Sequence, residues 1–499
     1  MMPAQDRPAA REPRPGALAP EASQGLLDAI VEASRLAASD AEKTRTGDLI
    51  RELAAEVHQG TVGLDRDLAT SIDARVAELD QMLSDQLNAI LHHPDFQRLE
   101  ASWRGLKELV TQSETGPMLR IKVLNASRQD LLKDFRAAPD YDQSALFRAV
   151  YEEEYGTFGG APYAALVGDF EFGRGPEDFR LLEELSHVAA AAHAPFIAAA
   201  GPGLFGLDTF AELGRPRNLA RLFETVDYAK WKSFRESEDA RYVGLVVPRT
   251  LGRLPYGPQT VPAEAFDFRE DVDGSDHGKY LWTNAAYAYA ARLTRAFAEY
   301  GWLAAIRGVE GGGLVEGLPT HCFRTDDGEI ALKCPTEVAV TDRNEKLLSD
   351  LGFMPLVHCK NTGYAAFFTG QSAQKPKTYQ TEAANANARL STQLPYLFAV
   401  SRIAHYLKAI MRDKVGSFAS RQGVQDHLNA WLAQYVLLDD SASQEAKSKF
   451  PLREAHVEVA DVPGKPGVYR AAAFLRPHFQ LDELTVSLRL VAELPRSSR

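Results

Sequence analysis

Cysteine is scarce in this sequence of 499 residues, and its three thiols, Cys322, Cys334 and Cys359, form no CxxC pair. An odd number of widely spaced cysteines excludes a disulfide-stabilised secreted domain and is typical of a reducing compartment. The first 20 residues lack the apolar stretch of a signal peptide. No segment approaches the roughly 18 consecutive apolar residues of a membrane span. We therefore expect a cytoplasmic protein without direct membrane insertion.

Basic residues also do not outnumber acidic ones. The chain carries 56 Lys and Arg against 68 Asp and Glu, which gives a formal charge of −12. A dedicated nucleic-acid-binding protein needs a concentrated basic surface, so we expect no nucleic-acid partner. Hydrophobic residues make up 45% of the chain and charged residues 25%, a balance typical of a globular protein with a large core.

The catalytic signatures GxSxG and HExxH are absent as well. The nearest enzymatic pattern is GPGLFG, Gly201 to Gly206, which matches the dinucleotide-binding GxGxxG and follows a strand-like PFIAAA. Pro202, however, removes an amide hydrogen from the phosphate cradle that this motif would need. We therefore interpret GPGLFG as a tight structural turn, with a nucleotide-binding enzyme as the alternative.

Two clusters of potential metal ligands have unsuitable spacing. The acidic run from Glu270 to Asp276 resembles the start of a calcium loop, but its twelfth position, counted from Asp271, is Trp282 rather than Glu. The cysteines and histidines are spaced too irregularly for structural zinc, and each thiol lies in an apolar, strand-like run where it would behave as a small hydrophobe. A Cys/His nucleophile remains open, although no activating context is visible. We expect no catalytic, cofactor-binding or metal-binding residues.

The N-terminal arm, residues 1–60, begins with a proline-rich stretch without hydrophobic periodicity, which predicts disorder. A short amphipathic helix is predicted in GLLDAIVEASRLAA and a second helix in GDLIRELAAEV. The apolar face of the first helix consists of Leu26, Leu27, Ile30, Val31 and Leu36. The pattern indicates helices on tethers rather than part of a compact domain.

A regular apolar seam predicts one long helix between residues 68 and 90. Its apolar side chains recur in steps of four and three residues, a spacing suited to helix packing. They are Leu68, Ile72, Val76, Leu79, Leu83, Leu87 and Ile90. This helix packs either against its own domain or against a partner chain.

Strand-like and helical segments alternate from residue 118 onward, which predicts a mixed α/β body over residues 61–375. The predicted strands include MLRIKVLN (118–125), YAALVGDFEF, PFIAAA, YVGLVVPR and GFMPLVHC, and the predicted helices include PEDFRLLEELSHVAAAAH and TNAAYAYAARLTRAFAEYG. Residues 376–499 are predicted to be helical at first and then rich in strands. The last predicted strand, ELTVSLRLVAEL, places Leu484, Val486, Leu488 and Leu490 on one face.

Long irregular strings of this sequence also agree, in order, with a known family. They include HHPDFQRLEASWRGLKELV (92–110), EEEYGTFGGAPYAALVGDFEF (152–172), ESEDARYVGLVVPRTLGRLPYG (236–257), FDFREDVDGSDHGKYLWTNAAYA (266–288) and AVTDRNEKLLSDLGFMPLVHCKNT (339–362). From about residue 60 to the C-terminus, the chain resembles the large subunit of the type VI secretion contractile sheath, the VipB/TssC family. The resemblance implies a contractile tail-sheath-like subunit of mixed α+β fold, without a catalytic site or cofactor.

The resemblance also implies partners. They are a small sheath subunit of the VipA/TssB type, further copies of this chain in a helical sheath, an inner tube protein of the Hcp type, a baseplate, and a ClpV-type AAA+ unfoldase. The seam at residues 68–90 would contact the small subunit, and the last strand would link neighbouring protomers. The helix that contains Leu26 and Leu36 resembles the one that the unfoldase recognises in some members. A tail-sheath protein of a phage-like particle built from one chain type is a further alternative.

Overall fold

A computed structural model describes residues 40–59, 68–214, 218–263, 266–325, 327–415, 420–463, 468–478 and 480. The chain divides into two units, Met1–Gln86 and Leu87–Arg499, each of which is treated separately. In the first unit lie α2 (Asp40–His58) and most of α3 (Leu68–Leu91), which confirms two of the three helices predicted there. The helix predicted in GLLDAIVEASRLAA lies outside the described residues.

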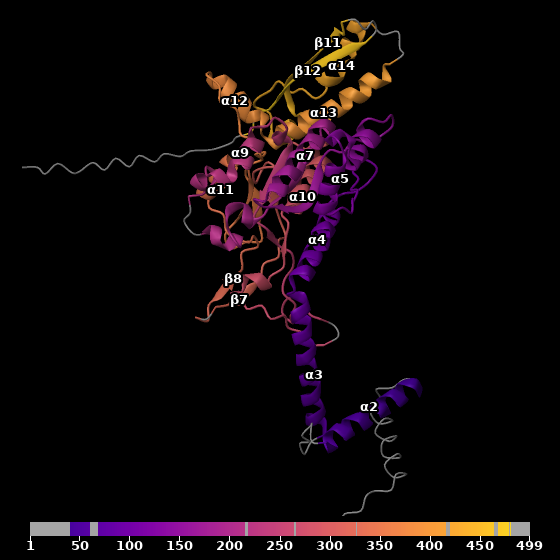
Figure 1. The fold of residues 1–499 in the computed structure, drawn as a ribbon, viewed down its shortest axis with the longest axis vertical. Coiled ribbons are helices and arrows are strands. Elements are labelled where there is room, and N and C mark those ends of the chain that lie inside the picture. The colour runs from indigo at the N-terminus through magenta and orange to yellow at the C-terminus, as the bar shows by residue number, and fades with distance from the viewer. Residues whose placement is uncertain are drawn as a thin grey trace, which may run out of the picture. The chain divides into compact units, whose positions relative to one another are not determined.

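A six-stranded sheet forms the centre of the second unit (Figure 1). The strand order is β1-β2-β3-β9-β10-β6; the first four strands are parallel, and each of the last two is antiparallel to the strand before it. The strands are β1 (Leu166–Phe172), β2 (Phe196–Ala200), β3 (Val243–Val247), β9 (Met354–His358), β10 (Ala365–Phe367) and β6 (Leu314–Val315). Every residue of β2 and β3 is buried, as expected for parallel strands covered on both faces.

Two predicted helices, α7 (Pro176–Ala192) and α10 (Ala286–Tyr300), pack against the parallel strands and are confirmed. Proline is tolerated in the first turn of α7, and His193 ends this helix in the left-handed conformation, with φ 51°. Before α10, the side-chain oxygen of Asn284 accepts a hydrogen bond from a backbone amide at 2.8 Å. The apolar faces of these helices and the sheet together form the main core.

Shorter elements complete the body. Along the chain, β1 is preceded by α4 (Pro94–Thr111), α5 (Arg128–Ala137), α6 (Ala145–Phe147) and the π-helix η2 (Arg148–Tyr155). Between the sheet strands come α8 (Leu219–Phe223), α9 (Ala229–Glu236), β4 (Thr250–Leu251), β5 (Trp282–Thr283), β7 (Cys322–Arg324), β8 (Ile330–Leu332) and α11 (Asp342–Asp350). The pairs β4-β5 and β7-β8 are small antiparallel sheets. Short 3-10 turns are η1 (Tyr141–Gln143), η3 (Pro202–Phe205), η4 (Phe210–Gly214), η5 (Val226–Tyr228), η6 (Asp239–Tyr242) and η7 (His277–Lys279).

The helix α13 (Leu394–Asp413) connects the main core to a second, smaller one. Leu394 and Phe398 are buried in the main core, whereas Ile403 and Leu407 are buried in the second. Because a single helix contributes to both cores, the C-terminal part is fixed to the body by packing rather than by a linker alone.

The second core lies between α13, α14 and a C-terminal hairpin, at the top of Figure 1. The remaining elements are α12 (Glu382–Ser391), α14 (Arg421–Ala433), α15 (Gln444–Lys449), β11 (Leu452–Asp461) and β12 (Tyr469–Pro477). Val457 and Val459 of β11 are buried in this core with Leu428 and Leu432 of α14. The helices and strands predicted for this region are confirmed as far as residue 477.

One predicted strand is wrong. Residues 118–125 form neither a helix nor a paired strand, and Met118, Val123 and Leu124 are largely exposed. Ile121 packs against a small apolar cluster formed by Leu109, Ala290 and Ala291. The local pattern is suited to a strand, but a strand also requires a hydrogen-bonding neighbour, and the described chain places none there.

Candidate functional site

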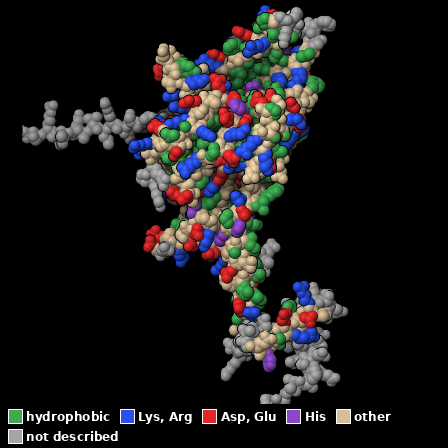
Figure 2. Space-filling view, in the orientation of Figure 1, with side chains coloured by type: hydrophobic (Ala, Val, Ile, Leu, Met, Phe, Trp, Pro, Cys, Tyr) green, Lys and Arg blue, Asp and Glu red, His purple; other side chains and the backbone are tan. Residues whose placement is uncertain are grey.

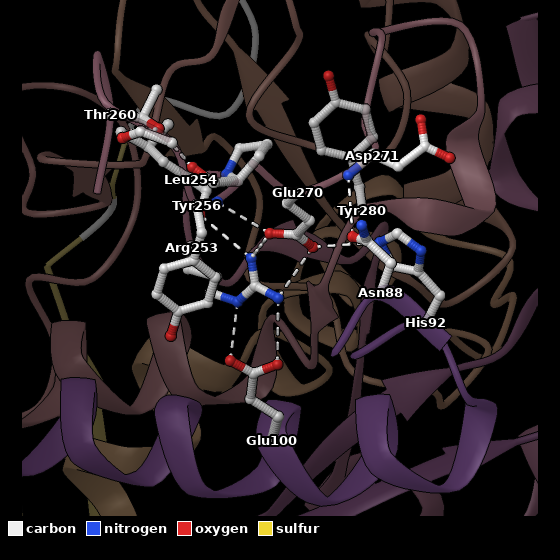
Figure 3. A network of polar contacts seen from close by, with 12 residues as sticks. Asn88, His92, Glu100, Arg253, Leu254, Tyr256, Thr260, Glu270, Asp271 and Tyr280 are labelled. Carbon is white, nitrogen blue, oxygen red and sulfur yellow. Dashed lines mark hydrogen bonds and ion pairs between the residues drawn. The ribbon is translucent and has the colours of Figure 1, made fainter. Parts of the chain in front are cut away.

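A buried ion-pair network fixes α4 to the loops of the body (Figure 3). The guanidinium of Arg253 donates to two carboxylates, those of Glu270, at 2.5 and 3.1 Å, and of Glu100 on α4, at 2.8 Å. The Arg253 and Glu270 side chains are only 7% and 1% exposed. Burial raises the pKa of Glu100, but hydrogen bonds and the charge of Arg253 outweigh this effect, so the net pKa is lowered.

The same network reaches the end of α3. His92 Nε2 lies 3.2 Å from a carboxylate oxygen of Glu270, and Asn88 accepts a hydrogen bond from the amide of Asp271 at 2.9 Å. The amide of Tyr256 also donates to Glu270, at 2.9 Å. These contacts hold the last turn of α3 and the start of α4 against the loop around residue 270. Sequence reasoning missed this network, because its members are distant in the sequence and nothing local marks them.

The GPGLFG run forms a tight turn, the 3-10 helix η3, closed by Gly206 at φ 64°. Three of its backbone amides are already bonded. Gly201 N donates to Phe172 O, and Leu204 N donates to Gly201 O. Gly206 N donates within the turn as well. A dinucleotide site needs such amides free for phosphate, so this geometry favours the structural turn.

The carboxylates of the acidic run are directed to different partners. Asp273 accepts hydrogen bonds from the hydroxyl of Ser275 at 2.7 Å and from the amides of Ser275 and Asp276 at 2.8 and 3.2 Å. Together these bonds lower its pKa to about 2. Asp271 pairs with Lys279 at 2.6 Å, and Glu270 belongs to the Arg253 network. Within the described ranges, no three His, Cys, Asp or Glu side chains are grouped so that they could hold a metal ion.

The three thiols differ in their surroundings. Cys322 and Cys359 are exposed, so the expectation that each thiol is a buried small hydrophobe is wrong for these two. Cys334 is half-buried, and its sulfur lies 3.3 Å from Nδ1 of His358. The Cys/His pairing that the sequence left open therefore has a physical counterpart at one of the three cysteines.

The predicted seam lies along α3, and most of its described side chains are exposed. Ile72, Leu79 and Leu83 have exposed fractions of 42%, 46% and 52%. Val76 and Ile90 are exposed in the same way, and Leu87 is half-buried. Leu68 begins α3, but its side chain lies outside the described part of the structure. An apolar row of this length in contact with water is typical of an interaction surface.

The next helix carries a similar apolar face. Phe96, Leu99, Trp103 and Val110 of α4 are exposed, with Trp103 at 66%. Elsewhere on the second unit, charged side chains of both signs are interspersed on the face in view in Figure 2, as on an ordinary solvated surface. The exposed apolar side chains of α3 and α4 are therefore the stronger candidates for contact with a partner.

The C-terminal hairpin ends at an anchored residue. The amide of Gln480 donates to the hydroxyl of Tyr396 at 2.8 Å, and its side chain accepts from Arg307 at 2.6 Å and donates to the carbonyl of Ala304 at 3.0 Å. In the described chain, β12 pairs with β11 alone. Any chain segment that follows Gln480 therefore starts from a fixed point on the body.

Two sets of predicted site residues lie outside the described residues. They are Leu26, Leu27, Ile30, Val31 and Leu36 of the arm, and Leu484, Val486, Leu488 and Leu490 of the last strand. None of the described helices has the combined length and apolar character that crossing a bilayer requires.

Two family models match the chain. Residues 73–374 match the EvpB/VC_A0108 tail sheath N-terminal domain, and residues 383–494 match the EvpB/VC_A0108 tail sheath gpW/gp25-like domain. Together these matches extend over most of the sequence.

A curated relative is the type VI secretion system sheath protein TssC1 of Pseudomonas aeruginosa. It is 51% identical over 450 residues, which cover 89% of this chain and 90% of the relative. Among solved structures, a chain of the anti-feeding prophage baseplate is similar with a TM-score of 0.36 and 10% identity. The similarity covers 63% of this chain and 66% of that chain, which is just under two thirds of its length. The contracted sheath of an extracellular contractile injection system gives 0.35 at 8% identity, covering 62% and 68%.

Proposed function

The chain belongs to the EvpB/VipB family of tail-sheath proteins and is a structural subunit of a type VI secretion sheath, and we propose that it assembles by pairing with a small sheath subunit of the VipA/TssB type. Family membership rests on 51% identity along 89% of the chain. The observation that best supports the pairing is the row of exposed apolar side chains on α3.

The α3 row suits a helical partner. Its side chains recur in steps of four and three residues, so they form one stripe that a second amphipathic helix can cover. Covering such side chains removes apolar surface from water at about 25 cal/mol per Å². Leu79 and Leu83, near the middle of the stripe, would be covered most completely.

The last predicted strand would link neighbouring protomers. Support comes from β12, whose second edge has no strand partner in the described chain, and from the anchored Gln480. An edge strand presents unpaired backbone groups that a strand from another protomer can bind. A paired strand on an anchored connection would keep protomers attached while their bodies move.

The arm, residues 1–60, would be the segment by which an unfoldase recognises the sheath for disassembly, so that its subunits can be used again. The face formed by Leu26, Leu27, Ile30, Val31 and Leu36 has the pattern of a helix that binds in an apolar groove, and the proposed receptor is a ClpV-type unfoldase. We assign residues 61–375 to the sheath body and residues 376–499 to the C-terminal sheath core segment. The inner tube of the Hcp type and the baseplate are the remaining proposed partners, in the cytoplasm.

We propose no enzymatic activity for this chain. The bonded amides around η3 argue against nucleotide binding there. In the acidic run, Asp273 accepts from the backbone amide of Ser275, and Asp271 pairs with Lys279. Thermal unfolding with and without added dinucleotides or ATP tests the enzyme alternative. A concentration-dependent rise in the melting temperature would favour it.

Co-expression with a tagged small sheath subunit tests the proposed pairing. We expect the two chains to purify together in a fixed ratio through salt washes, because the contact is apolar. If the chain instead forms sheaths by itself and ignores the small subunit, the alternative of a sheath built from one chain type is correct.

A further inference from the structure

A thiol and an imidazole meet at the end of β9. The sulfur of Cys334 lies 3.3 Å from Nδ1 of His358, the last residue of β9, and His358 Nε2 lies 2.7 Å from the carbonyl oxygen of Thr362. Because a carbonyl can only accept, Nε2 carries a hydrogen. In the neutral ring, Nδ1 is then the acceptor, and it faces the thiol.

The same contacts suit the charge-separated pair. If the thiol proton moves to Nδ1, the imidazolium has two N–H donors, one directed at the Cys334 sulfur and the other at Thr362 O. The hydroxyl of Thr336 lies 3.2 Å from the sulfur and 3.0 Å from the carbonyl oxygen of Val338, so its one hydrogen can be donated to either of these acceptors. No regrouping of side chains is needed, which is the arrangement of an activated thiol next to an oriented base.

The pKa shifts of Cys334 and His358 agree with this geometry. Burial raises the pKa of Cys334, but the hydrogen bonds from His358 and Thr336 outweigh burial, and the net pKa is lowered. Burial lowers the pKa of His358, and its bonds to Cys334 and Thr362 outweigh that effect, so its net pKa is raised. Lys333, the preceding residue, is a further cation: its ammonium donates to the carbonyl oxygen of Gly274 at 3.0 Å and interacts electrostatically with Cys334.

We propose that Cys334 is a nucleophilic thiol and a site of covalent modification by hydroperoxides. The thiolate sulfur attacks one oxygen of the peroxide, the O–O bond breaks, and a sulfenic acid forms on Cys334. The departing oxygen takes the proton held by His358 and leaves as water or an alcohol. The sulfur is oxidised, the peroxide is reduced, and no further reactant is needed.

The chain contains its own controls, because Cys322 and Cys359 are exposed thiols in the same molecule. If exposure alone governed reactivity, both would react faster than the half-buried Cys334. If the His358 contact governs it, Cys334 reacts faster at low pH, where ordinary thiols are protonated. The ranking of the three cysteines in one sample therefore separates the two explanations.

The test is alkylation of the full-length protein with iodoacetamide between pH 5.5 and 9, with the label on each cysteine-containing peptide quantified by mass spectrometry. We expect alkylation of Cys334 to reach its half-maximal rate at a lower pH than alkylation of Cys322 and Cys359. At pH 6, each unit by which the pKa of Cys334 lies below that of the exposed thiols should make its labelling about tenfold faster. Brief hydrogen peroxide treatment with dimedone present should trap the sulfenic acid at Cys334 first.

Two variants complete the design. His358→Gln should move the Cys334 profile to that of the exposed thiols, whereas Cys359→Ser should leave it unchanged. Slower labelling of Cys334 than of both other cysteines at every pH would overturn the proposal, as would an unchanged profile in His358→Gln. The ranking within the wild-type chain decides the question even if His358→Gln does not fold.

Discussion

At the scale of single residues, Arg253 joins two carboxylates in the interior of the protein. It neutralises Glu270 and Glu100 inside a network in which Glu270 is almost fully buried. Removing one member of such a network leaves a charge uncompensated, which costs more than the intact pair contributes. The network matters here because it fixes α4, and with it the end of α3, to the body.

Arg253→Met should therefore lower the free energy of unfolding by about 3–5 kcal/mol. The matched control is Arg295→Met, since Arg295 pairs with Glu299 at 2.9 Å but is 48% exposed. We expect the control to change stability by about 0.5 kcal/mol or less. Urea denaturation of both variants measures the difference, and equal midpoints would refute a structural role for Arg253.

The buried His405 should make the stability of the folded protein depend on pH. His405 is buried, donates from Nε2 to the carbonyl of Ala192 at 2.8 Å, and has Nδ1 3.4 Å from the Arg402 guanidinium. Burial is the main cause that lowers its pKa to about 4, from 6.5. The unfolded chain then binds a proton before the folded one does, so stability is lost as the pH falls from about 6.5 to about 4.

This single group should reduce the free energy of unfolding by about 2 kcal/mol between pH 7.5 and pH 5. Denaturation at the two pH values should show a smaller loss in His405→Gln than in the wild type. His427 is exposed, and His427→Gln should keep the wild-type loss. An identical pH dependence in His405→Gln would show that other groups govern acid sensitivity.

At the scale of elements, the α3 stripe makes a prediction about assembly rather than stability. Leu83 is 52% exposed in the isolated chain, so Leu83→Asp should barely change folding. It should weaken binding of the small subunit roughly a hundredfold, because an unpaired charge would be buried at the contact.

The matched control for the stripe is Gln81→Glu. Gln81 is exposed, and its position two residues before Leu83 places it on the opposite side of the helix. The substitution therefore adds the same charge away from the stripe, and the variant should bind normally. Isothermal titration of both variants measures the difference, and equal affinities would exclude the stripe as the contact surface.

The last predicted strand makes a different prediction. Leu488→Pro removes a backbone donor from the strand, so strand pairing between protomers should fail. Leu488→Val keeps the donor and serves as the control. We expect both variants to bind the small subunit, with tubes visible by electron microscopy only for Leu488→Val. Full-length tubes from Leu488→Pro would mean that another segment connects the protomers.

Much of the element structure could be predicted from the sequence. Continuous apolar runs located β1, β2, β3 and β9, and the seam located α3, because burial on both faces or along one stripe leaves a local pattern. Residues 118–125 have an equally apolar pattern but no strand partner in the described chain, and pairing is not a local property. The short β6 and β10 carry too few residues for a periodic signal.

Some features of the candidate sites could also be predicted from the local sequence, whereas others depend on contacts that only the fold creates. The turn at GPGLFG can be predicted from local chemistry alone, because Pro202 argues against a phosphate cradle. The Arg253 network and the Cys334–His358 contact join residues that the fold brings together from different loops and strands. A single sequence carries no signal that pairs them.

At the scale of the whole molecule, the described surface is that of a subunit of a larger assembly. Its second unit has two packed cores joined by α13, yet α3 and α4 expose apolar side chains that a monomer would be expected to bury. The same exposure predicts that the chain expressed alone is poorly soluble and that the small subunit restores solubility.

Electron microscopy of the chain co-expressed with a small sheath subunit is the decisive measurement of this assembly. We expect hollow helical tubes that contain both proteins, with neither protein forming such tubes alone. A monodisperse, soluble chain that neither binds the small subunit nor forms tubes with it would refute the proposed assembly.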